Sequence, residues 1–76
     1  MSSLTSKQIR MYMLEFEPSP GFVLKLSRKQ FEDLVLDTID VDIADMQESN
    51  AKRLKHLLQT CTDEQVNLLV EALRHS

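Results

Sequence analysis

The strongest constraint on the fold is a signature for the start of a helix, which occurs three times along the chain. In each copy a Thr or Ser is followed three residues later by a Gln, and the pairs are Thr5 and Gln8, Ser27 and Gln30, and Thr62 and Gln65. In such a capping box the hydroxyl accepts a hydrogen bond from a first-turn amide, and the Gln side chain accepts one from the cap residue. The sequence therefore predicts three helix starts.

Apolar residues recur at helical spacing after each start, and also after a fourth start at Ser49 or Asn50. These stripes predict a core made of Ile9, Phe16, Phe31, Leu34, Val35, Leu54, Leu57, Leu58, Val66, Leu69 and Leu73. A chain of 76 residues is the size of one small domain. We therefore predict an all-α fold, a compact four-helix domain that covers residues 1–76.

Two segments interrupt the helical pattern. The first helix should end near Glu17, because Pro18 disfavours helical geometry in the residue before it. Gly21 is the only glycine in the chain, and it is the expected site of a positive φ angle. Residues 22–26 alternate in polarity and predict one short extended connector. The second helix should fray around Asp40, where β-branched and Asp residues alternate.

The composition argues against several functional classes. The net charge is −3, which disfavours nucleic acid as a partner because phosphate binding requires excess positive charge. No stretch approaches the roughly 20 apolar residues of a membrane span. A single cysteine, Cys61, cannot form an internal disulfide and lies on an apolar stripe. We therefore expect a buried thiol in a reduced, cytoplasmic protein.

The sequence offers no catalytic, cofactor or metal motif. Neither His56 nor Cys61 stands in a recognisable arrangement with a base or an orienting group, so we expect no enzyme activity. The acidic run Asp40, Asp42 and Asp45 lacks the glycine and the final carboxylate of a calcium-binding loop. We therefore expect no catalytic residues, no cofactor and no metal.

The remaining signals predict a surface for a partner. Helix one, which starts at Thr5, is apolar on more than one side. Helix three, which starts at Ser49 or Asn50, carries a basic run of Lys52, Arg53, Lys55 and His56. The candidate partner-binding residues are Met11, Met13, Val23, Arg28, Lys52, Arg53 and Lys55. A solvated basic face accounts for the same run. The leading hypothesis is a non-enzymatic protein–protein interaction or regulatory module, whose partner is another protein or a copy of itself docked through helix one and the connector. The alternative is a small nucleic-acid-binding regulator that uses the basic face of helix three.

From Phe22 onward the order of elements resembles a small helical module found at the N-terminus of predicted bacterial defence and abortive-infection-type proteins. The matching residues are Phe22 to Arg28, Phe31, Val41 to Asp45, Ser49 to Leu54, Leu57 and Leu58. The resemblance implies an accessory module of bacterial origin without catalytic residues. It would belong to a larger effector or act on a separate partner. It also singles out Asp42 and the Lys52–Arg53 pair. For these residues we predict that the carboxylate either bridges to a guanidinium in the first turns of the helix that starts at Ser49 or Asn50, or accepts from the free amides of that helix.

Overall fold

The computed structural model describes residues 3–18, 21 and 23–75. Its helices are α1 (Ser6–Phe16), α2 (Arg28–Ile39), α3 (Asn50–Thr60) and α4 (Asp63–Arg74). The described part of the chain contains no strand. These observations confirm the predicted all-α, four-helix fold.

Each predicted capping box forms. At α1, Gln8 donates its backbone N–H to the Thr5 hydroxyl at 3.2 Å, and the Gln8 side chain accepts from the Thr5 N–H at 2.9 Å. The same reciprocal pairs start α2 and α4. Ser49 caps α3 by accepting from the Lys52 N–H at 3.4 Å. The helix starts are therefore determined locally, because every cap uses residues three positions apart.

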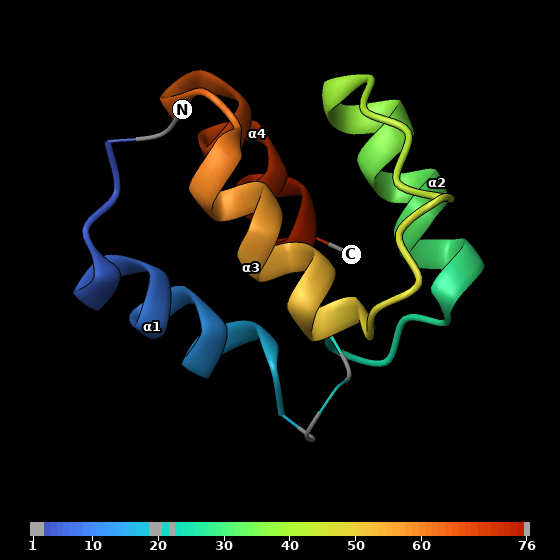
Figure 1. Ribbon diagram of the computed structural model, residues 1–76, viewed down its shortest axis with the longest axis horizontal. Coiled ribbons are helices and arrows are strands. Elements are labelled where there is room, and N and C mark those ends of the chain that lie inside the picture. The colour runs from blue at the N-terminus through green and yellow to red at the C-terminus, as the bar shows by residue number, and fades with distance from the viewer. Residues whose placement is uncertain (1–2, 19–20, 22, 76) are drawn as a thin grey trace.

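Helices α1 and α2 lie on opposite sides of the pair formed by α3 and α4 (Figure 1). Helix α1 packs against α3, and α2 packs against α4. Only Cys61 and Thr62 separate α3 from α4, so the chain turns directly from one central helix into the next. The Cα radius of gyration is 11.0 Å, as expected of a compact domain of this length.

The core follows the predicted stripes closely. Every predicted core residue is buried except Leu34, which is only partly buried at the edge of the cluster. Cys61 is buried as predicted, and the core also contains apolar residues that the predicted core did not include, namely Val23, Ile39, Ile43, Ala51 and Val70. Three of these, Val23, Ile39 and Ile43, come from the connectors or from the last residue of α2. The core therefore extends beyond the helical faces.

The connector between α1 and α2 differs from the predicted extended segment. Gly21 has the expected positive φ of 84°, but Leu24 also has a positive φ, of 53°. Leu24 donates its N–H to the Phe16 carbonyl at 2.8 Å, and Leu26 donates to Val23 at 3.1 Å, which closes a turn. The turn places Val23 in the core. Phe22, the first residue of the predicted alternation, lies outside the described residues.

Residues 40–49, which we call the α2–α3 linker, contain no helix. Helix α2 ends where fraying was predicted, and Asp40 adopts a left-handed conformation with φ 56°. The Asp42 carboxylate accepts from the Ala44 N–H at 2.9 Å within the linker, and the Arg53 guanidinium pairs with Glu32 in place of the predicted bridge to Asp42. The linker contributes Ile43 to the core and has few backbone hydrogen bonds of its own.

A bidentate ion pair between Glu15 and Arg74 connects α1 to α4. Arg74 donates its Nε–H to Glu15 Oε2 at 2.7 Å and its Nη2–H to Oε1 at 2.9 Å. The Arg74 guanidinium, through these hydrogen bonds and its charge, holds the pKa of the Glu15 carboxyl below its ordinary value. Because folding lowers the pKa of this carboxyl, the ion pair stabilises the folded protein at pH values above the ordinary carboxyl pKa. This stabilisation is lost as the pH falls through the pKa that Glu15 has in the folded protein.

The buried stripe of α3 yields the first prediction. Leu57→Ala should lower the free energy of unfolding by about 2 to 5 kcal/mol, because Leu57 is almost fully buried. Urea denaturation followed by circular dichroism measures the loss. Leu14→Ala, which truncates an exposed leucine on α1, is the matched control and should change the midpoint little. Equal midpoints for both variants would contradict the core assignment.

The ion pair yields the second prediction. Arg74→Gln should raise the pKa of Glu15 toward its ordinary value, because the donor that stabilises the carboxylate is removed. An NMR titration of the Glu15 side-chain carboxyl between acidic and neutral pH measures the shift. Arg10→Gln removes an exposed arginine of α1 that forms no ion pair with the described residues, and it should leave the Glu15 pKa unchanged. A Glu15 pKa that is the same with and without Arg74 would show that the pair does not persist in solution.

Candidate functional site

The basic run on α3 divides into one buried cation and several exposed groups. Arg53 is fully buried, whereas Lys52, Lys55 and His56 are exposed. Arg53 stands three residues after Asn50 and four before Leu57, so these three residues share one side of the helix. This corrects the surface position that the sequence suggested for Arg53. Its spacing from Leu57 on the predicted apolar stripe is the sequence signal that places it beside the core, but the sequence does not show the partners that compensate its charge.

The Arg53 guanidinium is paired at every nitrogen. Its Nη1 lies 2.9 Å from Glu32 Oε2 on α2 and 3.4 Å from Asn50 Oδ1. Its Nε donates to the Met46 carbonyl of the linker at 2.9 Å, and Nη2 donates to the same oxygen. Among the described residues, no buried side-chain nitrogen or oxygen lacks a hydrogen-bond partner. The buried charge is therefore compensated by one carboxylate and three hydrogen bonds.

Arg28 and Asn50 extend this network. Arg28 donates to the Glu48 carbonyl at 2.8 Å and to the Met46 carbonyl at 3.2 Å. The Asn50 amide donates to the carbonyls of Leu26 at 3.2 Å and Ser27 at 3.3 Å. Arg28, predicted as a partner-binding residue, thus binds the linker of its own chain. The network joins α2, α3, the linker and the connector, and its role is architectural.

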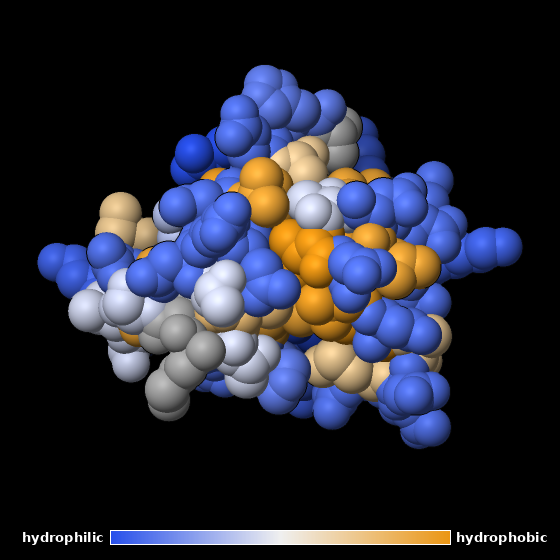
Figure 2. Space-filling view, turned by 90° about the horizontal axis from the view of Figure 1, so that it is seen from above, coloured by the Kyte–Doolittle hydropathy of each residue, from blue (hydrophilic) through white to orange (hydrophobic). Residues whose placement is uncertain are grey.

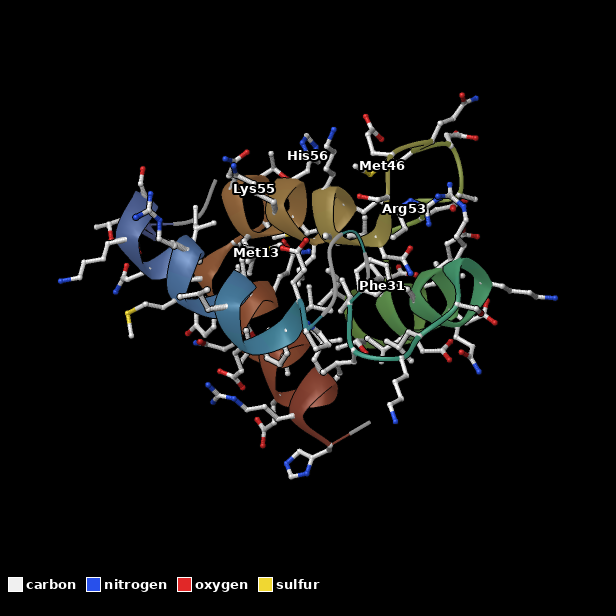
Figure 3. All side chains as sticks on the ribbon, turned by 90° about the horizontal axis from the view of Figure 1, so that it is seen from below. Met13, Phe31, Met46, Arg53, Lys55 and His56 are labelled. Atoms are coloured by element: carbon white, nitrogen blue, oxygen red, sulfur yellow. The ribbon has the colours of Figure 1, made fainter. Side chains whose placement is uncertain are left out.

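The structure places the remaining predicted residues on different surfaces. Val23 is fully buried, so its side chain cannot contact a partner in this fold. Met11 is 61% exposed and Met13 is partly buried, although both belong to α1. Met13 and Lys55 lie together between α1 and α3, away from Arg53 and Met46 (Figure 3).

These two residues line a groove of about 370 Å³ between the helices, which we call the α1–α3 groove. Its lining residues are Ser6, Ile9, Arg10, Met13, Glu17, Lys55 and Gln59. The floor includes the apolar side chains of Ile9 and Met13, and Arg10 and Lys55 supply a cation from each helix. Sequence reasoning found Met13 and Lys55 but missed Arg10, because periodicity does not show which helices become neighbours.

Two further residues extend this surface along the helices. Leu14 follows Arg10 by four positions and is 77% exposed, and Lys52 precedes Lys55 by three positions. Residues three or four apart are neighbours on a helix surface. An exposed leucine on α1 and an exposed lysine on α3 therefore lie next to residues that line the α1–α3 groove.

Apolar surface also occurs elsewhere. Leu36 on α2 is 44% exposed and Leu68 on α4 is 48% exposed. The face seen from above in Figure 2 gathers hydrophobic side chains toward the half of the molecule that contains α2, whereas much of the rest is hydrophilic. The α1–α3 groove differs from this area because it combines apolar side chains with cations from two helices.

The thiol and the metal-binding side chain types of the described residues form no reactive arrangement. Cys61 is buried, and burial raises the pKa of its thiol, which keeps it protonated and weakly nucleophilic at neutral pH. Among the described residues, no group of three or more His, Cys, Asp or Glu side chains is arranged to hold a metal ion. In the same part of the chain, none of the helices has both the length and the apolar character needed to span a bilayer.

The buried network yields the third prediction. Arg53→Met should lower the free energy of unfolding by about 2 to 4 kcal/mol, because charge-assisted hydrogen bonds are lost and buried polar groups remain unpaired. Urea denaturation measures the change. The neighbouring exposed lysine gives the matched control, and Lys52→Met should change stability by no more than about 0.5 kcal/mol. An Arg53→Met protein that is as stable as the parent would show that the buried pair contributes no net stability.

Comparisons with known proteins assign no family to this chain. No protein-family model matches it, and no curated protein or solved structure is significantly similar to it.

Proposed function

We propose that this chain is a non-enzymatic module that binds another protein through the surface formed by α1 and α3. The observation that carries the proposal is that α1 is packed on one side by Ile9 and Phe16 yet exposes Leu14 and leaves Met13 partly exposed in the α1–α3 groove. Exposed apolar side chains beside a groove are typical of helix-docking surfaces. Methionine suits such surfaces because its flexible side chain adapts to different partners.

The distribution of cations favours a protein over a nucleic acid as the partner. Arg53 is buried, and Arg28 donates to carbonyls of the linker. The basic face of α3 is therefore left with two lysines and His56. Affinity for duplex DNA grows with the number of phosphates that the protein neutralises, so this face supports fewer phosphate contacts than the sequence suggested. Nucleic-acid binding by α3 remains the second candidate and is tested below.

The resemblance to bacterial accessory modules supports the same functional class. A domain whose described residues offer a docking surface and no cluster for metal chemistry suits a role in positioning or regulating a separate protein. We place this role in the bacterial cytoplasm, in keeping with the single, buried cysteine.

Site-specific photo-crosslinking in the native host tests the proposal and is the fourth prediction. A photoreactive amino acid at position 14 should yield covalent adducts with a protein, because this side chain is exposed at the rim of the α1–α3 groove. The matched control carries the same amino acid at position 68, an exposed leucine on α4, and should yield few adducts. Adducts are separated by mass after treatment with nuclease or protease.

The outcomes separate the functional classes. Protease-sensitive, nuclease-resistant adducts at position 14 support the protein-binding module. Nuclease-sensitive adducts would favour the nucleic-acid-binding regulator. Adducts of equal yield at positions 14 and 68 would contradict a specific role for the surface formed by α1 and α3.

A further inference from the structure

We infer that the α1–α3 groove binds an acidic amphipathic segment of another protein, in which carboxylates flank a short apolar stripe. This inference rests on the proposed function and specifies the chemistry of the partner at the same surface. It follows from three properties of the groove: its apolar floor, its unpaired cations, and the separation of these cations from the acidic part of the molecule.

The floor of the groove provides anchoring positions. Ile9 is mostly buried beneath it and Met13 is partly exposed, so both present apolar atoms to an occupant. Leu14 adds an exposed apolar side chain on the α1 rim. Removing such surface from water provides the general driving force for docking. A partner therefore needs apolar side chains directed into the groove.

The rims carry cations that have no acidic partner among the described residues. Arg10 lies on the α1 rim and Lys55 on the α3 rim, Lys52 precedes Lys55 by three positions on the same helix, and all three are exposed. Among the described residues, ion pairs join only Arg53 to Glu32 and Arg74 to Glu15. The rim cations are thus available to carboxylates of a partner. Complementary charge increases the rate of encounter and excludes partners of like charge.

The one carboxylate that lines the groove is already engaged. Glu17 lies at the C-terminal end of α1, and its Oε2 accepts from the Gly21 N–H at 2.9 Å. It therefore helps to hold the connector and lies at one end of the groove. An occupant with carboxylates along its length would meet the cations of both rims, and only its end would approach Glu17.

Acidic residues are concentrated away from the groove. With the buried Arg53–Glu32 pair set aside, the segment from Ser27 to Asn50 contains six acidic and two basic residues, whereas residues 1–26 are net positive by one and residues 51–76 are balanced. This segment forms α2 and the α2–α3 linker, which lie across the molecule from α1 (Figure 1). The molecule is therefore polarised, and an acidic partner is attracted to the α1 side and repelled by the α2 side.

The geometry also limits the size of the occupant. Helix α1 has 11 residues, which corresponds to a length of about 16 Å at 1.5 Å per residue. A partner helix of about three turns would cover this length, with apolar residues at positions i, i+3 or i+4, and i+7 facing the floor. Acidic residues on both sides of that stripe would then face Arg10 on one rim and Lys55 on the other.

Selection from a display library tests the inference and is the fifth prediction. The probe is a library of helical peptides of about 12 residues, the length that matches the groove. All side chains on the helix surface are randomised, so that both the charge and the apolar stripe can emerge from the selection. Peptides enriched on the full chain should carry net negative charge and an apolar stripe. Their binding, measured by fluorescence anisotropy, should weaken as salt is raised because the rim contacts are electrostatic.

Charge-reversal variants identify the surface. Arg10→Glu and Lys55→Glu should each weaken binding of the enriched peptides by about tenfold or more, because a like charge replaces the complementary one. Lys29→Glu makes the same change at an exposed position of α2 and should leave binding unchanged. Circular dichroism confirms that each variant is folded. NMR shift mapping with an enriched peptide should locate the changes at Met13, Lys55 and their neighbours.

The outcomes decide between occupants. Acidic, stripe-bearing peptides that lose affinity with Arg10→Glu and Lys55→Glu, but not with Lys29→Glu, support the inference. Enrichment of basic or uncharged peptides, or no enrichment at all, would overturn it. Self-association in sedimentation that Lys55→Glu abolishes would assign the groove to a second copy and would also overturn it. If position 14 forms protein adducts but the library yields no acidic peptides, the proposed function stands and only the acidic character of the partner is refuted.

Discussion

The buried guanidinium of Arg53 is the interaction on which the arrangement of the chain depends. It contacts Glu32 on α2, Asn50 on its own helix, and the Met46 carbonyl in the α2–α3 linker. The linker has no helix or strand partner for its backbone groups, so polar side chains must satisfy them. Arg53 and Arg28 do so at the same carbonyl. Without these contacts, nothing polar would fix the linker against the helices that it connects.

Such a network favours one arrangement over others more than it adds net stability. Removing a guanidinium and a carboxylate from water is costly, and the attraction between them offsets the cost only when the remaining hydrogen bonds are made. Here they are made, because no buried side-chain polar atom of the described residues is unpaired. Glu32 also keeps partial contact with water. An alternative packing of α2 would leave the arginine without its partners, so the network discriminates strongly against misfolded arrangements.

The same arginine shapes the surface. Because Arg53 is buried, the positive charge that α3 displays comes from the exposed Lys52 and Lys55, of which Lys55 lines the α1–α3 groove. The acidic residues of α2 and the linker then lie across the core from these lysines. The burial of Arg53 thus decides which cations of α3 are available to an acidic partner, whereas the acidic composition of α2 and the linker sets the opposite side of the molecule.

Local sequence determined most of the secondary structure. Thr5, Ser27 and Thr62 each cap a helix through a residue three positions away, and such short-range chemistry is visible in one sequence. The buried stripes followed from helical periodicity, so all the predicted core residues except Leu34 are buried. Leu34 lies at the edge of its stripe, where burial depends on how closely the neighbouring helix approaches.

Tertiary structure alone decided the polar core and the candidate site. Composition and periodicity placed Arg53 in a basic run, and only the approach of α2 and the linker provides the carboxylate and the carbonyl that allow its burial. Val23 enters the core because the connector turns at Leu24, a change that alternation of polarity cannot show. The α1–α3 groove joins Arg10 to Lys55, residues 45 positions apart. Periodicity fixes the face of each helix, but contacts between distant faces depend on the packing of the whole chain.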